Sequence, residues 1–279
     1  MQTALHIVAT PIGNEGDLSP RALDVLRSAH IIAAEDTRRT GVLLKSHAID
    51  AKLVAYHDHN EEQAAETVCA AIQRGEDAVL VCDAGTPAVS DPGYRLVRMA
   101  QDLGIAVVPV PGPCAAIVAL SGSGIASDRF FFEGFLPAKP RARRDRIEAL
   151  KVYPHSLIFY EAPHRFADTL LDMVDVFVGG REAALARELT KTYETIRRTS
   201  LAELLDWVNR DPDQQKGEIV LIVSPAKSDE QKLLSKEALL LLTTLAEYVP
   251  ARKAAKLVSS VTGVKTSILY DIIVAQRNT

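Results

Sequence analysis

The sequence predicts a two-domain α/β protein with a small C-terminal helical segment, and three observations support this prediction. The chain has 279 residues, which corresponds to roughly two domains at about 150 residues each. Short apolar runs alternate with helical patterns through the first half, as in a mainly parallel sheet covered by helices on both faces. The pattern changes over residues 126–154 and after Pro225. We therefore expect domains at 1–125 and 126–225, and a helix-turn-helix-like segment at 226–279.

The first segment is expected to hold five strands that alternate with five helices. Ser19 and Pro20 begin the first helix, because serine caps a helix N-terminus and proline suits its first position. Apolar residues at helical spacing follow, from Ala22 to Ala29. The pattern predicts strands at residues 5–9, 31–34, 53–56, 78–82 and 106–110, and helices at residues 20–29, 37–45, 61–73, 92–103 and 113–120.

The second segment breaks this rhythm at its start, where we expect a linker over residues 126–154. Strands are then predicted at 156–160, 183–186, 192–198 and 219–223, with helices at 163–176 and 201–209. The third segment is helical, with helices predicted at 233–247, 250–260 and 265–276. Gly263 separates the last two in the manner of a helix-turn-helix.

The net charge of −4 excludes a uniformly basic nucleic-acid-binding protein, although local basic regions remain. Residues 139–151 carry six basic and two acidic side chains, a net charge of +4, and the C-terminal segment is mildly basic. The run lies close to Phe130, Phe131, Phe132 and Phe135. It is either a solvated helix face beside core phenylalanines or a phosphate-binding surface with rings for stacking.

The cellular location is predicted from what the sequence lacks. Cys69, Cys82 and Cys114 show no paired spacing, which is typical of buried thiols in a reducing compartment. The N-terminus has no basic region and no small-residue cleavage pattern, and no apolar run is long enough to cross a bilayer. We expect a soluble, cytoplasmic protein.

Three predicted strands end in tight loops of glycine and proline, at residues 10–13, 85–87 and 111–113. Such residues can simply mark turns. However, ligands of open α/β sheets bind at the carboxyl ends of strands, and glycine allows a close approach of the backbone. No phosphate-binding G-x-x-x-x-G-K-[ST] motif is present, and no dinucleotide-binding glycine pattern follows a strand.

Charged residues near strand ends are candidates for catalysis. Glu35 and Asp36 precede Arg38, so they could provide a general base and an anion clamp, or simply acidic residues at a helix N-terminus. Asp91 could likewise cap a helix that begins at Pro92. Lys191 could act as a base only if burial or neighbouring cations lowered its pKa; otherwise it belongs to a solvated loop.

Histidines offer two further possibilities. His57 and His59 have the spacing of metal ligands, but no third ligand stands at a telling distance, so no metal is predicted. His164 and Arg165 begin a predicted helix after a strand, where they could bind a phosphate or cap the helix.

Seven segments together resemble the ribosomal RNA small subunit methyltransferase I family, a branch of the tetrapyrrole methylase superfamily. They are residues 8–14 (VATPIGN), 34–38 (AEDTR), 83–87 (DAGTP), 90–93 (SDPG), 111–115 (PGPCA), 134–137 (GFLP) and 186–191 (ARELTK). The resemblance covers about residues 4–224, and the C-terminal helices resemble the helical tail of this branch. It implies the two-domain class III methyltransferase fold, with S-adenosylmethionine (AdoMet) held folded between the domains.

The resemblance also assigns the cofactor site. It implies that Gly85, Thr86, Pro87 and Val89 face the methionine end. Thr10, Pro11 and Gly13 line the floor of the cleft, and Cys114 and Ala115 contact the cofactor where relatives often have Ser or Thr followed by Ala. Tyr160, Leu189 and the segment from Gly217 to Ile219 close over the adenosine.

The implied reaction is methylation of the ribose 2′-hydroxyl of a cytidine in the decoding region of 16S rRNA by a homodimer. The candidate bases are Asp36, Glu35, Asp91 and Lys191, and Asp36 is preferred because Arg38 beside it could bind a substrate phosphate. The other candidate contacts to RNA are Arg141, Arg143, Arg144, His164 and Arg165. Two alternatives remain, namely a methyltransferase acting on a tetrapyrrole precursor and an inactive protein that only binds rRNA.

Overall fold

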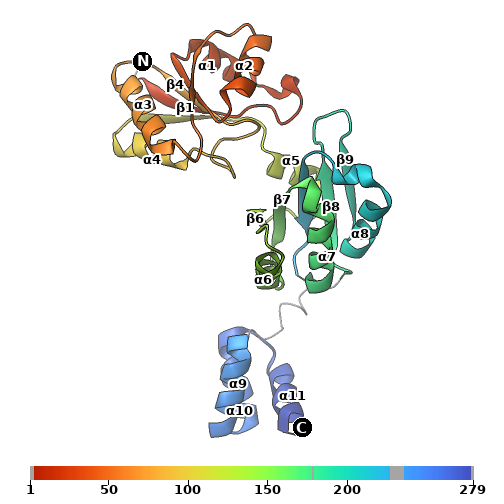
Figure 1. The fold of residues 1–279 in the computed structure, drawn as a ribbon. Helices are drawn as coiled ribbons and strands as arrows, with labels where there is room; N and C mark the ends of the chain where they lie inside the picture. Colours follow the sequence, from red (N-terminus) through yellow and green to blue (C-terminus); the bar gives the residue numbers. More distant parts are fainter. Residues whose placement is uncertain (1–2, 178, 227–235, 278–279) are drawn as a thin grey trace.

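The computed structural model describes residues 3–177, 179–226 and 236–277, which form two sheet domains and a helical bundle (Figure 1). The first sheet contains β1 (Ala4–Val8), β2 (Ile31–Ala34), β3 (Lys52–Ala55), β4 (Ala78–Val81) and β5 (Ala106–Val110), in the order β3-β2-β4-β1-β5. All its pairings are parallel, as the alternation of strands and helices predicts. The helices of this part are α1 (Pro20–Ser28), α2 (Thr37–Ser46), α3 (Glu61–Gln73) and α4 (Tyr94–Asp102), with the short 3-10 turn η1 (Glu15–Asp17) before α1.

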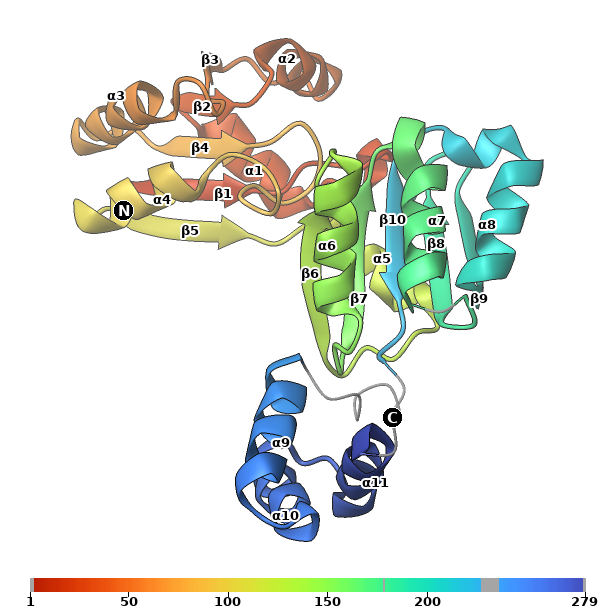
Figure 2. The same ribbon diagram turned by 60° about the horizontal axis from the view of Figure 1, so that its bottom comes forward.

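Two apolar cores form on the two faces of this sheet. Alternate residues of a strand point to opposite faces, so Leu5 packs with α3 and α4, whereas Val8 packs with α1 and α2. Because the strands are parallel, the loops after β1, β2, β4 and β5 all leave the same edge of the sheet. That edge faces the second domain (Figure 2).

The second sheet is mixed, with the order β6-β7-β10-β8-β9. Its strands are β6 (Phe130–Phe135), β7 (Ser156–Glu161), β8 (Glu182–Arg187), β9 (Thr195–Ser200) and β10 (Ile219–Val223). Only β6 and β7 pair in parallel. One face is covered by α6 (Pro140–Leu150), α7 (Phe166–Phe177) and α8 (Leu201–Arg210). Two short turns, η2 (Pro163–Arg165) and η3 (Pro212–Gln215), complete this domain.

The structure differs from the sequence prediction at the start of this domain. Residues 126–154, expected to be a linker, form β6 and α6, and their apolar residues Ile147 and Leu150 enter the second core. Helix α5 (Ala115–Ser123) also packs on the second sheet, through Ala116, Ala119 and Leu120. The second body of the protein therefore begins before residue 125, because α5 finds its apolar partners there.

The C-terminal bundle consists of α9 (Lys236–Tyr248), α10 (Ala251–Thr262) and α11 (Thr266–Arg277), which share a core that includes Leu242, Val258 and Leu269. Gly263 ends α10 with a φ of 71°, a left-handed conformation that glycine adopts at low cost. The predicted start of α9 at residue 233 lies outside the described residues. Within the ranges that the structure describes, no helix is long and apolar enough to cross a membrane.

Candidate functional site

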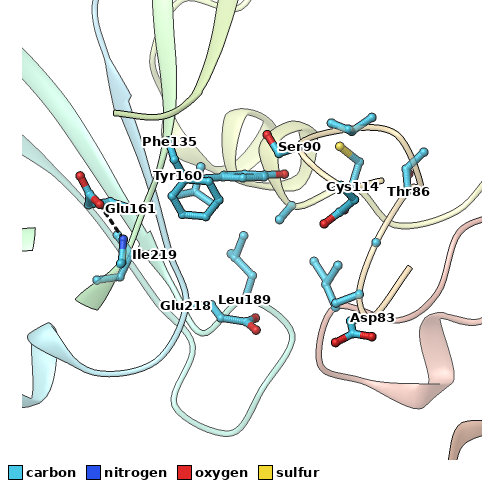
Figure 3. Close-up of a pocket in the computed structure, with 18 of the residues that line it drawn as sticks. Asp83, Thr86, Ser90, Cys114, Phe135, Tyr160, Glu161, Leu189, Glu218 and Ile219 are labelled. Carbon is cyan, nitrogen blue, oxygen red and sulfur yellow. Dashed lines mark hydrogen bonds between the residues drawn. The ribbon is translucent and has the colours of Figure 1, made fainter. Parts of the chain in front are cut away.

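A cavity of about 400 Å³ lies where the loops of the first sheet meet the second domain (Figure 3). This volume falls in the range of small-molecule sites. The first domain and the start of α5 contribute Ile12, Glu35, Arg39, Asp83, Ala84, Gly85, Thr86, Val89, Ser90, Asp91, Cys114 and Ala115. The second domain contributes Phe135, Tyr160, Glu161, Ala162, Pro163, Ala186, Leu189, Gly217, Glu218, Ile219 and Val220.

The loop after β4 is fixed by hydrogen bonds to the loops after β1 and β5. Gly85 and Thr10 exchange backbone hydrogen bonds of 2.9 and 3.0 Å, which join the loops after β1 and β4. Gly85 has a φ of +86°, which a residue with a side chain adopts only with strain. The Thr86 hydroxyl donates to the carbonyl of Pro113 at 2.8 Å and so ties this loop to the one after β5. These bonds hold the first-domain wall of the cavity in place.

Nine of the residues that sequence predicts as cofactor contacts line this one cavity: Gly85, Thr86, Val89, Cys114, Ala115, Tyr160, Leu189, Gly217 and Ile219. The other four do not line it. Thr10 is buried, and its hydroxyl donates to the carbonyl of Cys82 at 3.1 Å, so it supports the floor from below. Gly13 lies against the loop after β8, where an added Cβ would collide with the Lys191 side chain. Pro11 and Pro87 are not among the lining residues, although they adjoin Ile12 and Thr86 in sequence, which are.

Tyr160 forms the centre of the second-domain wall. Its hydroxyl accepts a hydrogen bond of 3.2 Å from the backbone N–H of Ala116 at the start of α5. The rings of Phe132 and Phe135 contact it edge-on, with centroids 5.0 and 5.7 Å away. Burial raises the pKa of Tyr160, so the phenol stays protonated near neutral pH. The centre of this wall is therefore aromatic and uncharged.

The cavity has an excess of carboxylates. Glu35, Asp83, Asp91, Glu161 and Glu218 line it, whereas Arg39 is the only basic residue among the lining residues. Three of the five have basic partners: the Arg39 guanidinium lies 3.1 Å from Asp83, Glu161 is paired with Arg165, and the Lys191 ammonium lies 3.0 Å from Glu218. The potential inside the cavity is therefore negative, which favours a ligand that carries positive charge.

Two of these carboxylates are perturbed by their surroundings. Burial, followed by the charge of Glu35, raises the pKa of Asp91 from 3.8 to about 6. Burial also raises the pKa of Glu35, to which the nearby Asp83 and Asp58 charges contribute. The interpretation of Asp91 as a helix cap is wrong, because α4 begins at Tyr94 with Gly93 as its N-cap. Asp91 instead lies in the cavity wall, where a pKa near neutrality suits proton transfer.

The structure does not place Asp36 or Lys191 in the cavity wall. Asp36 caps α2, accepting from the Arg38 backbone N–H at 2.8 Å, and its carboxylate also pairs with the Arg38 guanidinium at 2.8 Å. These bonds hold the pKa of Asp36 well below its usual range. Burial alone would lower the pKa of Lys191, but hydrogen bonds to Glu188 and Glu218 outweigh it and raise the pKa. Both residues are therefore weaker candidates for the base than Asp91.

The predicted RNA-binding arginines divide into paired and exposed groups. Arg143 is only 4% exposed, and its Nε lies 2.7 Å from Asp172, so it holds α6 on α7. Arg143 is therefore unavailable to RNA, and its predicted role in RNA binding is wrong. Arg144 is half-exposed and pairs with Asp172 at 2.8 Å and Asp175 at 3.1 Å. Arg165 is partly buried against Glu161.

Arg141, His164 and Arg38 are exposed, although Arg38 is paired with Asp36. His57 and His59 lie with ring centroids 6.0 Å apart. Among the described residues, no group of three or more histidine, cysteine or acidic side chains is arranged to hold a metal.

Several cavity residues were not predicted from sequence. Asp83, Ala84 and Ser90 belong to the motifs DAGTP and SDPG, so the motifs give a signal for them. Val220 lies within strand β10, and no sequence pattern marks it, whereas Glu218 falls inside the predicted segment from Gly217 to Ile219. Phe135 belongs to the motif GFLP and is one of four rings near the basic run, but neither pattern predicts its place in the cavity wall.

Comparisons with known proteins agree with this arrangement. A family model described as "Tetrapyrrole (Corrin/Porphyrin) Methylases" matches residues 4–205. The "Ribosomal RNA small subunit methyltransferase I" of Escherichia coli O157:H7 is 52% identical over 276 residues, 99% of this chain and 96% of its own length. The protein of the same name from Pseudomonas aeruginosa is 53% identical over 268 residues, 96% of this chain and 95% of its own length.

Solved structures with the same fold are more distant in sequence. The uroporphyrin-III-C-methyltransferase from Thermus thermophilus has a TM-score of 0.56 and 20% identity, covering 84% of this chain and 99% of its own. The cobalt precorrin-4 methyltransferase CbiF has a TM-score of 0.58 and 14% identity, covering 79% and 94%. These similarities establish the two-domain methylase fold. The family model and the relatives that are 52% and 53% identical along nearly the whole chain show that the protein belongs to the ribosomal RNA small subunit methyltransferase I family of the tetrapyrrole methylases.

Proposed function

We propose that this protein transfers a methyl group from AdoMet to the ribose 2′-hydroxyl of a cytidine in the decoding region of 16S rRNA. The observation that carries the proposal is the identity of 52% to the Escherichia coli protein over 99% of the chain, C-terminal helices included. The structural neighbours whose names indicate tetrapyrrole substrates are at most 20% identical among those compared above, so they support the fold and not the substrate.

The residues around the cavity fit AdoMet. The molecule carries a sulfonium and an ammonium group against one carboxylate, and the carboxylates of Glu35 and Asp91 give the cavity the opposite charge. The apolar side chains of Leu189 and Ile219 and the uncharged ring of Tyr160 suit a flat adenine. When bound, AdoMet supplies a methyl group carried on a positively charged sulfur.

The chain itself would orient the ribose and take up its proton. A ribose hydroxyl is a weak nucleophile until a base accepts that proton. With a pKa of about 6, Asp91 is mostly ionised at pH 7 yet remains basic enough to accept a proton. Burial raises that pKa most, and the charge of Glu35 raises it further. We assign Asp91 as the base in place of Asp36, and Glu35 as its electrostatic partner.

The proposed partner is the small ribosomal subunit or its rRNA, with the exposed Arg38, Arg141 and His164 as candidate phosphate contacts. Such a substrate would place the protein in the cytoplasm. The homodimer implied by the family resemblance is also part of the proposal, and sedimentation velocity of the full chain tests it.

Methyl transfer from labelled AdoMet tests the function. The acceptors are small subunits from a strain that lacks this activity, the naked rRNA, and a porphyrinoid precursor. Label in alkali-resistant dinucleotides of the rRNA is expected, because a 2′-O-methyl group blocks alkaline cleavage at that position. Label only in the porphyrinoid would overturn the proposal. AdoMet binding without transfer to any acceptor would favour a protein that only binds rRNA.

A further inference from the structure

Strand β6 contains a bulge just before it reaches the cavity. Phe131 and Phe132 pair with Leu157 and Ile158 of β7, but the next pair joins Gly134 to Phe159. Glu133 is therefore an extra residue in the ladder. Bulges are rare between parallel strands and often redirect a side chain next to an active site.

The bulge reverses the direction of Phe135. Side chains alternate between faces, and Phe131 packs into the core under α6 and α7. In an unbroken strand, Phe135 would point to that same face. Because of the extra residue, Phe135 pairs with Tyr160 and its ring contacts the Tyr160 ring on the opposite face, in the cavity wall.

Contacts from both domains hold this bulge. The Glu133 carboxylate accepts two hydrogen bonds from the Arg146 guanidinium of α6, at 2.7 and 2.6 Å. Gly134 has a φ of +73°, and a Cβ placed on it would lie 3.0 Å from the Ser90 hydroxyl of the first-domain loop. The backbone at the bulge thus lies against the loop that carries Asp91.

Phe135 is the one large apolar residue of the cavity lining that is exposed, at 55%. Figure 3 shows it beside Tyr160, across from Ser90. An exposed ring that its neighbours hold in one orientation is a stacking surface for a nucleobase. Its place beside the Ser90 and Asp91 loop is where the target ribose must lie if Asp91 takes up the proton.

We propose that Phe135 is the platform on which the base of the target nucleotide stacks, and that Glu133 and Arg146 are positioning residues that aim it. This proposal rests on the proposed function, since it needs an RNA substrate. It also assigns Arg146, one of the six basic residues of the run 139–151, to the protein's own structure and not to phosphate binding.

The test compares Phe135→Ala and Phe135→Trp with Phe130→Ala. Phe130 is 43% exposed at the other end of the same strand and does not line the cavity, so it is a matched control. Methyl transfer to small subunits that lack the modification is measured, together with AdoMet affinity by calorimetry. Phe135→Ala should lower kcat/KM for the subunit roughly 5- to 150-fold, the loss expected for one stacked base. Phe135→Trp should lose less than Phe135→Ala, because its ring can still stack, and Phe130→Ala should stay near wild type. AdoMet affinity should not change in Phe135→Ala or Phe130→Ala.

A double-mutant cycle tests the positioning residues. Arg146→Met should lower kcat/KM in the wild-type chain but have little further effect in the Phe135→Ala chain, because both changes remove the same platform. Additive losses would show that Arg146 acts independently, and so would overturn its positioning role. Unchanged kcat/KM for Phe135→Ala would overturn the platform. Weaker AdoMet binding by that variant would reassign the ring to the cofactor site. If the wild-type chain methylates no rRNA at all, the proposed function fails, and the platform fails with it.

Discussion

Replacing Asp91 with asparagine removes the carboxylate that the structure places in the cavity with a pKa of about 6. A group with this pKa is about nine-tenths ionised at pH 7, half ionised at pH 6 and about one-tenth ionised at pH 5. Turnover of the wild-type protein should therefore fall about tenfold for each pH unit below 6. The Asp91→Asn variant should lose about 10²- to 10⁴-fold in turnover, the usual contribution of a general base. It should also lose the acid limb of the pH profile, that is, the fall in turnover below pH 6.

The assay is single-turnover methyl transfer to small subunits at saturating AdoMet, followed between about pH 5 and 8. Asp36→Asn is the matched control, because Asp36 is the same residue type but caps α2 outside the cavity wall. Glu35→Gln provides a second check. The Glu35 charge raises the pKa of Asp91, so its removal should move the acid limb to lower pH.

The reasoning would be refuted if Asp91→Asn kept wild-type turnover with the same acid limb. A large loss in Asp36→Asn alone would restore the prediction from sequence, in which Asp36 is the base. Calorimetry with AdoMet separates both outcomes from a loss of cofactor binding.

Three further predictions follow from packing and charge. Gly217→Ala should weaken AdoMet binding, because the residue has a φ of +79° and an added Cβ would collide with Glu188. Gly75 also has a positive φ but has open space around it, so Gly75→Ala should bind AdoMet normally in the same titration. Arg143→Met should lower the free energy of unfolding by about 3 kcal/mol in urea, since it leaves Asp172 with Arg144 alone, and an unchanged midpoint would contradict this. Arg141→Ala should reduce the slope of RNA affinity against salt by about one, whereas an unchanged slope would make Arg141 part of a solvated face.

Much of the fold followed from local pattern. The strands at Ile31–Ala34, Ala106–Val110 and Ile219–Val223 and the helix Glu61–Gln73 have the bounds predicted from sequence. These are strongly patterned segments with clear apolar runs or helical spacing, so local signals suffice. The stretch 126–154 misled the prediction, because its basic residues suggested a solvated linker. Ion pairs with Asp172 and Glu133 in fact allow Arg143 and Arg146 to pack inside the second domain.

The candidate site was also predicted only in part from local pattern. The glycine and proline loops marked the first-domain wall, since Gly85 has a positive φ and Gly13 and Gly112 lie too close to their neighbours to carry a side chain. The choice among the candidate bases could not be made from sequence, because Glu35 and Asp36 are adjacent in the chain yet only Glu35 lines the cavity.

The sequence by itself determined the fold class, the first-domain loops and the family, because these depend on local composition and on motifs in a fixed order. The tertiary structure decided which charges are free and which are paired. It raised the pKa of Asp91 through burial and lowered that of Asp36 through Arg38. It also turned Phe135 into the cavity through one extra residue in β6. These outcomes depend on distances between segments far apart in the chain, and no local pattern encodes such distances.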